Sequence, residues 1–338
     1  MRLKKTLAII MGAALSVASL SGCSQTTLNY ASELEKTSKW ESTSSEMTGK
    51  ISIDAQGTKE DINFTSTAYG SGDKGYAKVN FTTDNNELNF NMPNIEVYVD
   101  NGISYINKSY YEDMYTNNGI DIPSGLKDLN ADYIALDSGV DMVSIEAMAN
   151  EPEVLTNLLK SIFGDSDIDL PYVQNGREYT INLNSNDAVD LGVKGIKAIA
   201  NNLENVNNTF KLGFTSDDIT QIKAMVSDQY FTNGISGLKE TIAGSTISSK
   251  ELFSDDDYSI DFGMNLIVKD FGNISLSING TTTKSEATDI VLPDNAVKLT
   301  QEEFQAILGG NDQKQVNSQI SYGKEELGLK NFIVNPAA

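Results

Sequence analysis

The sequence predicts an α+β fold: a curved, half-barrel-like antiparallel β-sheet with helices covering its apolar face. Three observations predict it. Apolar and polar residues alternate with a period of two from Thr48 to about residue 100, helical spacing dominates the middle of the chain, and a long alternating hairpin begins near residue 258. Strands, then helices, then strands are typical of an α+β domain rather than of repeated β-α-β units.

The first strands are expected to form an antiparallel meander with one buried and one polar face. Turn residues separate the runs at Gly57 and at residues 70–73, 84–86 and 101–102. One-sided alternation of this kind indicates a sheet that faces water on its polar side. The apolar residues expected on the buried face are Ile51, Ile53, Ala55, Ile62, Phe64, Ala68, Ala77, Val79, Phe81, Leu88, Phe90, Met92, Ile95, Val97 and Val99.

Helical spacing of apolar residues predicts four helices before the late hairpin. One short helix lies within residues 24–45 and ends near Trp40, and another begins at Pro152 and ends at Gly164. A third covers residues 186–204, and a fourth starts at Thr215, where Asp218 follows three residues later. Short strands are expected between them, at residues 179–183 and 210–214.

The end of the folded region is predicted as a hairpin followed by a helix. Apolar residues alternate without a break over 258–268, a turn follows at 270–273, and the chain returns through 274–278. Thr300 and Glu303 have the spacing of a capping box, and Leu299 and Phe304 that of a hydrophobic staple.

The first two dozen residues have the three zones of a bacterial signal peptide. Arg2, Lys4 and Lys5 precede an apolar run from Leu7 to Leu20, which is shorter than the roughly 20 residues that span a bilayer core. The following Leu-Ser-Gly-Cys resembles the bacterial lipobox. That resemblance implies cleavage after Gly22 and a thioether-linked lipid on Cys23. Metabolic labelling with palmitate would detect this lipid.

This resemblance defines the expected organisation of the chain. Residues 1–22 are the signal peptide, 23–45 a lipidated tether with a short helix, 46–309 the α+β globular domain and 310–338 a polar C-terminal tail. The protein is therefore expected on a cell membrane, held by its lipid and facing away from the cytoplasm, on the cell surface or the periplasmic side. Two or more acyl chains hold a protein stably, whereas one does so only marginally.

Composition excludes several function classes. Without residues 1–22 the chain keeps 22 basic residues against 47 acidic ones, so nucleic-acid phosphates would be repelled. The chain has no histidine, and its single cysteine lies where the lipid would be attached. Catalytic mechanisms that use His or Cys are therefore impossible, and disulfides and Cys-based zinc sites are too. We expect a protein that is not an enzyme and carries no cofactor or metal.

The order of elements also resembles the half-barrel of LolA/LolB-like lipoprotein carriers. An N-terminal helix, a curved meander, central helices and a final hairpin are followed by Ile290-Val291-Leu292-Pro293, an apolar strand leading into a Leu-Pro turn. The helical material between residues 140 and 245 makes the chain longer than that family usually is. The resemblance implies a concave sheet that holds an apolar, lipid-like ligand.

Two groups of residues are candidate sites. Tyr105, Tyr110, Tyr111 and Tyr115 crowd around one turn and offer the aromatic faces of a sugar or peptide site, or else pack the rim of the sheet. The Asp165–Asp169 segment has alternate acidic residues like a calcium loop but lacks the glycine and glutamate that an EF-hand requires.

The expected function is a membrane-anchored binding module, with an apolar ligand or an envelope protein as partner besides the membrane itself. Two alternatives stay open: an envelope scaffold that acts through acidic or tyrosine-rich surfaces, and a hydrolase that uses two carboxylates.

Overall fold

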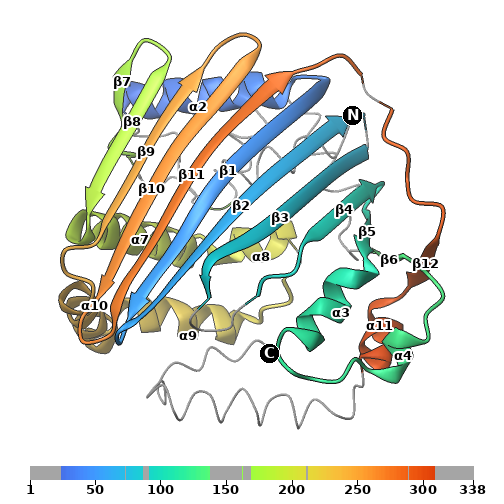
Figure 1. Ribbon diagram of the computed structural model, residues 1–338. Coiled ribbons are helices and arrows are strands. Elements are labelled where there is room, and N and C mark those ends of the chain that lie inside the picture. The colour runs from blue at the N-terminus through green and yellow to red at the C-terminus, as the bar shows by residue number, and fades with distance from the viewer. Residues whose placement is uncertain are drawn as a thin grey trace.

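The computed structural model describes residues 24–72, 74–86, 91–137, 162, 169–210, 212–287 and 289–308. Their frame is one open, mostly antiparallel sheet of twelve strands in the order β12-β6-β5-β4-β3-β2-β1-β11-β10-β9-β8-β7. Helices pack on one side of this sheet, so the molecule is an α+β fold, as predicted (Figure 1).

The meander supplies one half of the sheet. Its long strands are β1 (Ser42–Ala55), β2 (Thr58–Ser71) and β3 (Lys74–Asn86), and its short strands are β4 (Ile95–Asp100), β5 (Ile103–Asn107) and β6 (Tyr133–Asp137). β12 (Ala296–Leu299) adds to β6 in parallel, and the other neighbouring pairs are antiparallel.

The late strands complete the other half. β10 (Asp257–Val268) and β11 (Gly272–Lys284) form the predicted hairpin, and β11 pairs along the whole length of β1. Next to β10 follow β9 (Thr246–Phe253), β8 (Glu178–Asn184) and β7 (Val173–Asn175). The sheet is completed by pairing of β1 with β11, more than 200 residues later in the sequence, and the apolar face that the two strands share specifies their register.

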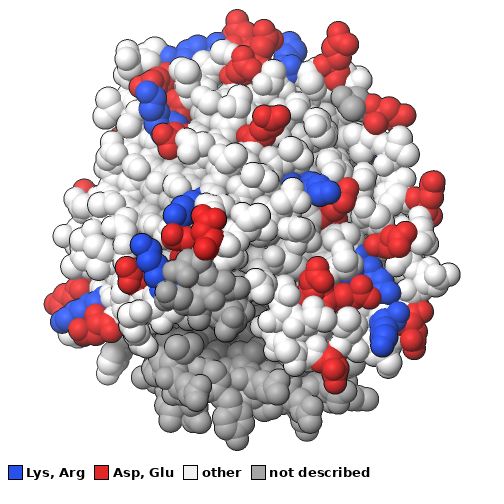
Figure 2. Space-filling model, viewed as in Figure 1, with Lys and Arg blue, Asp and Glu red and all other residues white. Residues whose placement is uncertain are grey.

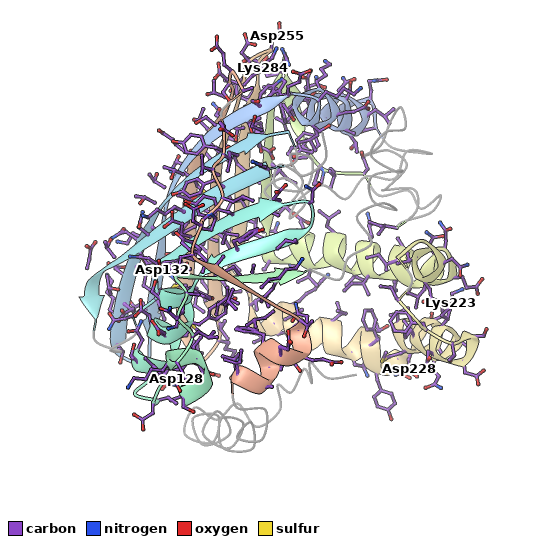
Figure 3. The ribbon with its side chains drawn as sticks, turned by 90° about the vertical axis from the view of Figure 1, so that its right-hand side faces the viewer. Asp128, Asp132, Lys223, Asp228, Asp255 and Lys284 are labelled. Atoms are coloured by element: carbon purple, nitrogen blue, oxygen red, sulfur yellow. The ribbon has the colours of Figure 1, made fainter. Side chains whose placement is uncertain are left out.

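Two groups of helices cover the sheet at opposite ends. At the β7–β9 end lie α2 (Gln25–Ser38) and α7 (Ser185–Asn201), and α8 (Leu203–Phe210), α9 (Ser216–Ser227) and α10 (Gln229–Thr241) continue the layer (Figure 3). At the β12 end lie α3 (Lys108–Thr116), α4 (Ser124–Lys127) and α11 (Gln301–Ile307).

Helix starts that carried capping signals were predicted correctly. Thr215 and Thr300 each form a full capping box, with Asp218 and Glu303 respectively, and Phe304 packs in one cluster with Leu299. The helix predicted over 24–45 is α2, which Ser24 caps. These local signals worked because each cap satisfies its own backbone donors without help from distant residues.

Several boundaries differ from the predictions. Residues 84–86 lie in β3 instead of forming a turn, because β3 keeps pairing with β2 past a register shift at Asp61/Ile62 and Asn63 donates to Asp84. Residues 210–214 are not a strand: α8 ends at Phe210, and the Asn207 side chain bonds the backbone N–H and C=O of Phe214.

Strands β5, β6, β7, β9 and β12 and helices α3, α4, α8 and α10 were not predicted. Helix α3 lies where a turn was expected, and the apolar segment 290–292, expected as a strand, is not one. Leu88, Phe90, the 310–338 tail and all but Ile162 of the helix predicted over 152–164 lie outside the described residues.

Candidate functional site

The face of the sheet turned toward α2 and α7, called here the inner face, is largely apolar at its centre, with polar residues such as Ser45, Glu60 and Ser66 among the apolar ones. Register places the same-face residues of neighbouring strands opposite one another: Ile51 pairs with both Ile62 and Leu276, and Phe262 pairs with Ile278. This confirms the buried face predicted for the meander strands that the structure describes. The central inner-face residues are Ile51, Ile53, Phe64, Val79, Phe81, Ile95, Val97, Ile260, Phe262, Met264, Leu266, Ile274, Leu276 and Ile278.

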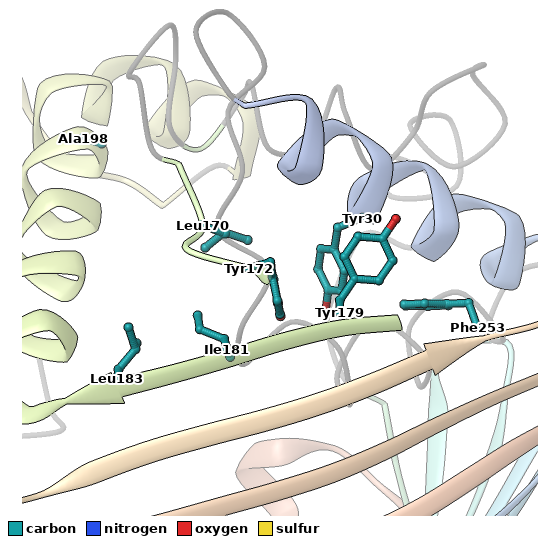
Figure 4. Close-up of a cluster of buried hydrophobic side chains, with 8 residues drawn as sticks. All are labelled: Tyr30, Leu170, Tyr172, Tyr179, Ile181, Leu183, Ala198 and Phe253. Carbon is teal, nitrogen blue, oxygen red and sulfur yellow. The ribbon is translucent and has the colours of Figure 1, made fainter. Parts of the chain in front are cut away.

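Both ends of the inner face are tightly buried. At the β8–β9 end, Tyr30 of α2 packs on Tyr179 and Phe253, with ring centroids 5.3 and 5.9 Å away (Figure 4). At the β6–β12 end, Leu126, Ile134, Leu136 and Phe304 form a second cluster. Tight burial here anchors the helices at the two ends of the sheet.

The centre of the inner face is packed less closely. The fourteen central residues named above are half-buried, although Ile62 on the same face of β2 is only 2% exposed; Tyr30, Tyr179 and Phe253 at the end are 2% exposed or less. Of the strands, α7 contacts chiefly β8 and β9, and α11 contacts β12. A protein interior is normally packed to crystal-like density, so a half-buried apolar surface inside the fold is the kind of lining that ligand sites have.

A buried carboxylate surrounded by tyrosines lies at the β8–β9 end. Glu251 of β9 is 1% exposed and accepts hydrogen bonds from the hydroxyls of Tyr30 (2.9 Å), Tyr172 (3.0 Å) and Tyr258 (2.7 Å). Ser249, two residues away on the same face, has its Oγ 3.3 Å from Oε1. The donors come from α2, from the segment before β7 and from β10, so one carboxylate ties three parts of the chain together.

This environment changes the acidity of the phenols. Burial first, and then the negative charge of Glu251, raises the pKa of Tyr30 and of Tyr258 well above 10. Burial likewise raises the pKa of Tyr179 to about 12. All three side chains therefore stay neutral donors or apolar packing groups at physiological pH.

Sequence reasoning missed this cluster. On the inner face of β9 the residues run Ile247, Ser249, Glu251, Phe253, and two polar residues in the middle hide the alternation. Only the first and last residues of this series, Ile247 and Phe253, are apolar. Two apolar positions are too few for a period-two pattern to predict a strand.

The four tyrosines predicted as one site are divided by the structure. Tyr111 and Tyr115 of α3 pack against the β6–β12 cluster, where Tyr111 lies 4.9 Å from Phe304, and Tyr110 contacts Tyr111 at 5.3 Å. Tyr105 lies on β5 and shares a face with its register partner Tyr98, opposite to the inner face.

The acidic segment before β7 is described only at its end. Asp165 and Asp167 lie outside the described residues. Asp169 accepts hydrogen bonds from the Ser24 backbone N–H (3.1 Å) and the Thr27 hydroxyl (2.6 Å). Burial raises the pKa of Asp169, but these hydrogen bonds outweigh it and lower the pKa. Asp169 therefore holds the start of α2.

Two kinds of feature are absent from the described residues. In this part of the chain, no three acidic or cysteine side chains come together as a group that could hold a metal ion. None of the helices described has the length and apolar character needed to cross a membrane.

Comparisons with known proteins add little. No protein-family model matches the chain, and no curated protein matches it. Among solved structures, it is similar to a chain described as the crystal structure of a bifunctional dehydratase-cyclase domain in ambruticin biosynthesis. The identity is 8%, the match covers 82% of this chain and 88% of the other, and the TM-score of 0.15 is too low to support any argument.

Proposed function

We propose that this protein is a lipid-anchored envelope protein that binds an apolar, lipid-like ligand between the inner face of its sheet and its helices. One observation carries the proposal: most apolar residues at the centre of the inner face are half-buried, Ile62 and Ala68 of β2 being buried exceptions, whereas the clusters at both ends are fully buried. Binding sites for small apolar molecules are largely preformed and lined by hydrophobic side chains. A curved sheet of this kind is also what the resemblance to LolA/LolB-like carriers leads us to expect.

A carrier of this type needs no catalytic group. The buried carboxylate Glu251 is occupied by three tyrosine hydroxyls and lies in the packed end of the sheet. We therefore assign it a structural role, and we propose binding rather than hydrolysis as the function.

The ligand-binding proposal predicts that Leu276→Asn weakens lipid binding, because it places a polar amide within the apolar lining. The measurement is titration of the chain Ser24–Ala338, which contains all the described contacts, with a fluorescent C16 fatty acid. We expect the dissociation constant to rise about tenfold, as the loss of one buried aliphatic side chain would cause.

The matched control is Ser277→Asn, which introduces the same side chain at the next residue of β11 but on the opposite face of the sheet. Ser277→Asn should bind as the wild type does. Equal binding by all three proteins, or no fatty acid retained by the wild type, would contradict the proposal.

The membrane anchor is proposed on Cys23, which lies outside the described residues. The next residue, Ser24, caps α2 and donates to Asp169, and the Arg177 guanidinium bonds Glu33 of α2 at 2.6 Å. These contacts would leave little free chain between the lipid and the fold. The lipid would then hold the domain close to the membrane surface, where a carrier exchanges its ligand.

The anchor predicts that Cys23→Ala releases the protein from membranes. In cells of the source bacterium, the wild type should fractionate with detergent-extracted membranes and incorporate labelled palmitate, and Cys23→Ala should do neither. The control is Ser24→Ala, which keeps the thiol. The proposed anchor is contradicted if the wild type incorporates no palmitate, or if Cys23→Ala is still extracted with membranes. Neither outcome affects the ligand-binding proposal, which the fatty-acid titration tests separately.

A further inference from the structure

The outer face of the sheet, opposite to the helices, combines ion pairs with many hydroxyl and amide side chains: Lys50, Lys78 and Lys250 lie beside Asp61, Glu96 and Glu178. Figure 2 views this face and shows mostly uncharged atoms, with Lys and Arg side chains mainly beside Asp or Glu. The outer-face hydroxyl and amide residues are Ser44, Thr48, Ser52, Asn63, Thr65, Thr67, Asn80, Thr82, Ser248, Ser259, Asn265, Asn273, Ser275, Ser277, Asn279, Thr281 and Thr283.

Four tyrosines form a row across this face. Tyr69 of β2 pairs with Tyr76 of β3, Tyr76 with Tyr98 of β4, and Tyr98 with Tyr105 of β5. The rings of Tyr69 and Tyr76 stack at 5.9 Å and 17°, and those of Tyr76 and Tyr98 lie 4.9 Å apart. Neighbouring strands are about 4.8 Å apart, so the rings line up at the strand spacing.

Polar contacts fix the middle of the row. The hydroxyls of Tyr76 and Tyr98 donate to the same oxygen of Glu96, at 3.1 and 3.2 Å, and Lys78 lies 3.7 Å from the other oxygen. Tyr133 adds a ring 5.6 Å from that of Tyr98. The aromatic side chains are thus held in place before any ligand arrives, which reduces the entropy lost on binding.

The row continues into a polar hollow. A depression of about 660 Å³ runs over β8, β9, β10, β11, β1 and β2, and Thr67, which lines it, is two residues from Tyr69 on the same face of β2. Hydroxyl and amide groups of Thr48, Thr281 and Asn279 line it as well, together with the charged side chains of Glu46, Glu178, Lys250 and Asp261. On the other side of the row, two residues further along β2, β3 and β4, a second hollow of about 540 Å³ is lined by Ser71, Lys74, Asp100 and Asp289.

We propose that the outer face binds a neutral glycan chain, with pyranose rings stacked on the tyrosine row and sugar hydroxyls bonded in the adjoining polar hollow. A pyranose ring has an apolar C–H face and a rim of hydroxyls, which matches aromatic faces that continue into hydroxyl and amide groups. An anionic polymer would be repelled by a net charge of −22. An extended peptide adds to a sheet through free strand edges, and the row lies on strands that are paired on both sides.

The competing explanation is that cross-strand tyrosine pairs only stabilise the sheet. It predicts that loss of a ring changes stability without any glycan binding. The two explanations therefore differ in a binding measurement.

The experiment is calorimetric titration of the chain Ser24–Ala338 with cellohexaose, chitohexaose and maltohexaose. We expect at least one of these neutral hexasaccharides to bind with a dissociation constant below about 1 mM. Tyr69→Ala should weaken that binding about tenfold, and Tyr69→Trp should restore it, because any aromatic face can stack. Tyr69 is 38% exposed, so neither variant should disturb folding.

The matched control is Tyr230→Ala on α10, where the tyrosine is 86% exposed but remote from the sheet. It should bind as the wild type does. The inference is overturned if no hexasaccharide binds, if Tyr69→Ala binds as tightly as the wild type, or if short uncharged peptides bind in place of sugars. Fatty-acid binding should be unchanged in Tyr69→Ala, so the glycan proposal and the fatty-acid proposal can be refuted independently of each other.

Discussion

Glu251→Ala is expected to lower the free energy of unfolding by about 3–5 kcal/mol, because three buried hydroxyl donors lose their common acceptor. The substitution leaves the hydroxyls of Tyr30, Tyr172 and Tyr258 without their common acceptor in a region closed to water. Each stranded donor costs on the order of 1–3 kcal/mol, and the missing side chain adds a small cavity. The N-terminal helix should loosen first, since Tyr30 is its most buried contact with the sheet.

Urea unfolding at pH 7 followed by far-ultraviolet circular dichroism measures this loss. Glu251→Gln keeps one carbonyl acceptor and should lose less than Glu251→Ala. The control is Glu178→Ala on the neighbouring strand, where the carboxylate is 30% exposed on the outer face and pairs with Lys250 at 2.9 Å. An exposed ion pair of this kind contributes below about 1 kcal/mol. A Glu251→Ala variant no less stable than Glu178→Ala would mean that the tyrosines find other partners.

The sequence predicted the parts of the fold that depend on local pattern. Period-two alternation found the meander and the β10–β11 hairpin because each strand shows one apolar and one polar face independently of its neighbours. Capping boxes located α9 and α11 for the same reason, since Thr215 and Thr300 bond within their own first turns.

Features that depend on pairing between distant strands could not be predicted. The tyrosine row exists only because register sets Tyr69 opposite Tyr76 and Tyr98 opposite Tyr105; in the sequence these residues look unrelated. The prediction instead grouped Tyr105 with the α3 tyrosines, which are its neighbours along the chain but belong to the other face. The Glu251 cluster likewise joins residues 30, 172, 251 and 258 from separate segments.

The inner face is an intermediate case. Its composition followed from alternation, but its incomplete burial did not, because burial depends on which strands the helices cover. α2 and α7 pack at one end and α11 at the other. A pattern of apolar residues predicts that a face is turned inward and leaves open whether protein or ligand fills the space beside it.

Alkaline unfolding is the second large effect expected from the Glu251 cluster. The folded protein holds Tyr30, Tyr179 and Tyr258 as neutral phenols because their pKa values are raised, to about 12 for Tyr179. In the unfolded chain a phenol ionises near pH 10. The stabilisation is thus complete below pH 10 and is lost as the pH rises through 10 toward the folded-state pKa. For Tyr179 alone the loss is about 1.4 kcal/mol at pH 11, and Tyr30 and Tyr258 add to it.

Urea midpoints between pH 8 and 11.5 test this slope. Tyr258→Phe removes one ionisable group and should give a shallower decline above pH 10, although it starts from a lower stability because the 2.7 Å hydrogen bond to Glu251 is gone. Tyr230→Phe, at an 86% exposed tyrosine, should follow the wild-type curve. Parallel curves for all three proteins would place the alkaline loss elsewhere than in the cluster. A shallower decline of stability above pH 10 for Tyr258→Phe, with Tyr230→Phe following the wild type, would mean that the tyrosine donors of Glu251 stay protonated in the folded protein. This is what a purely structural network requires.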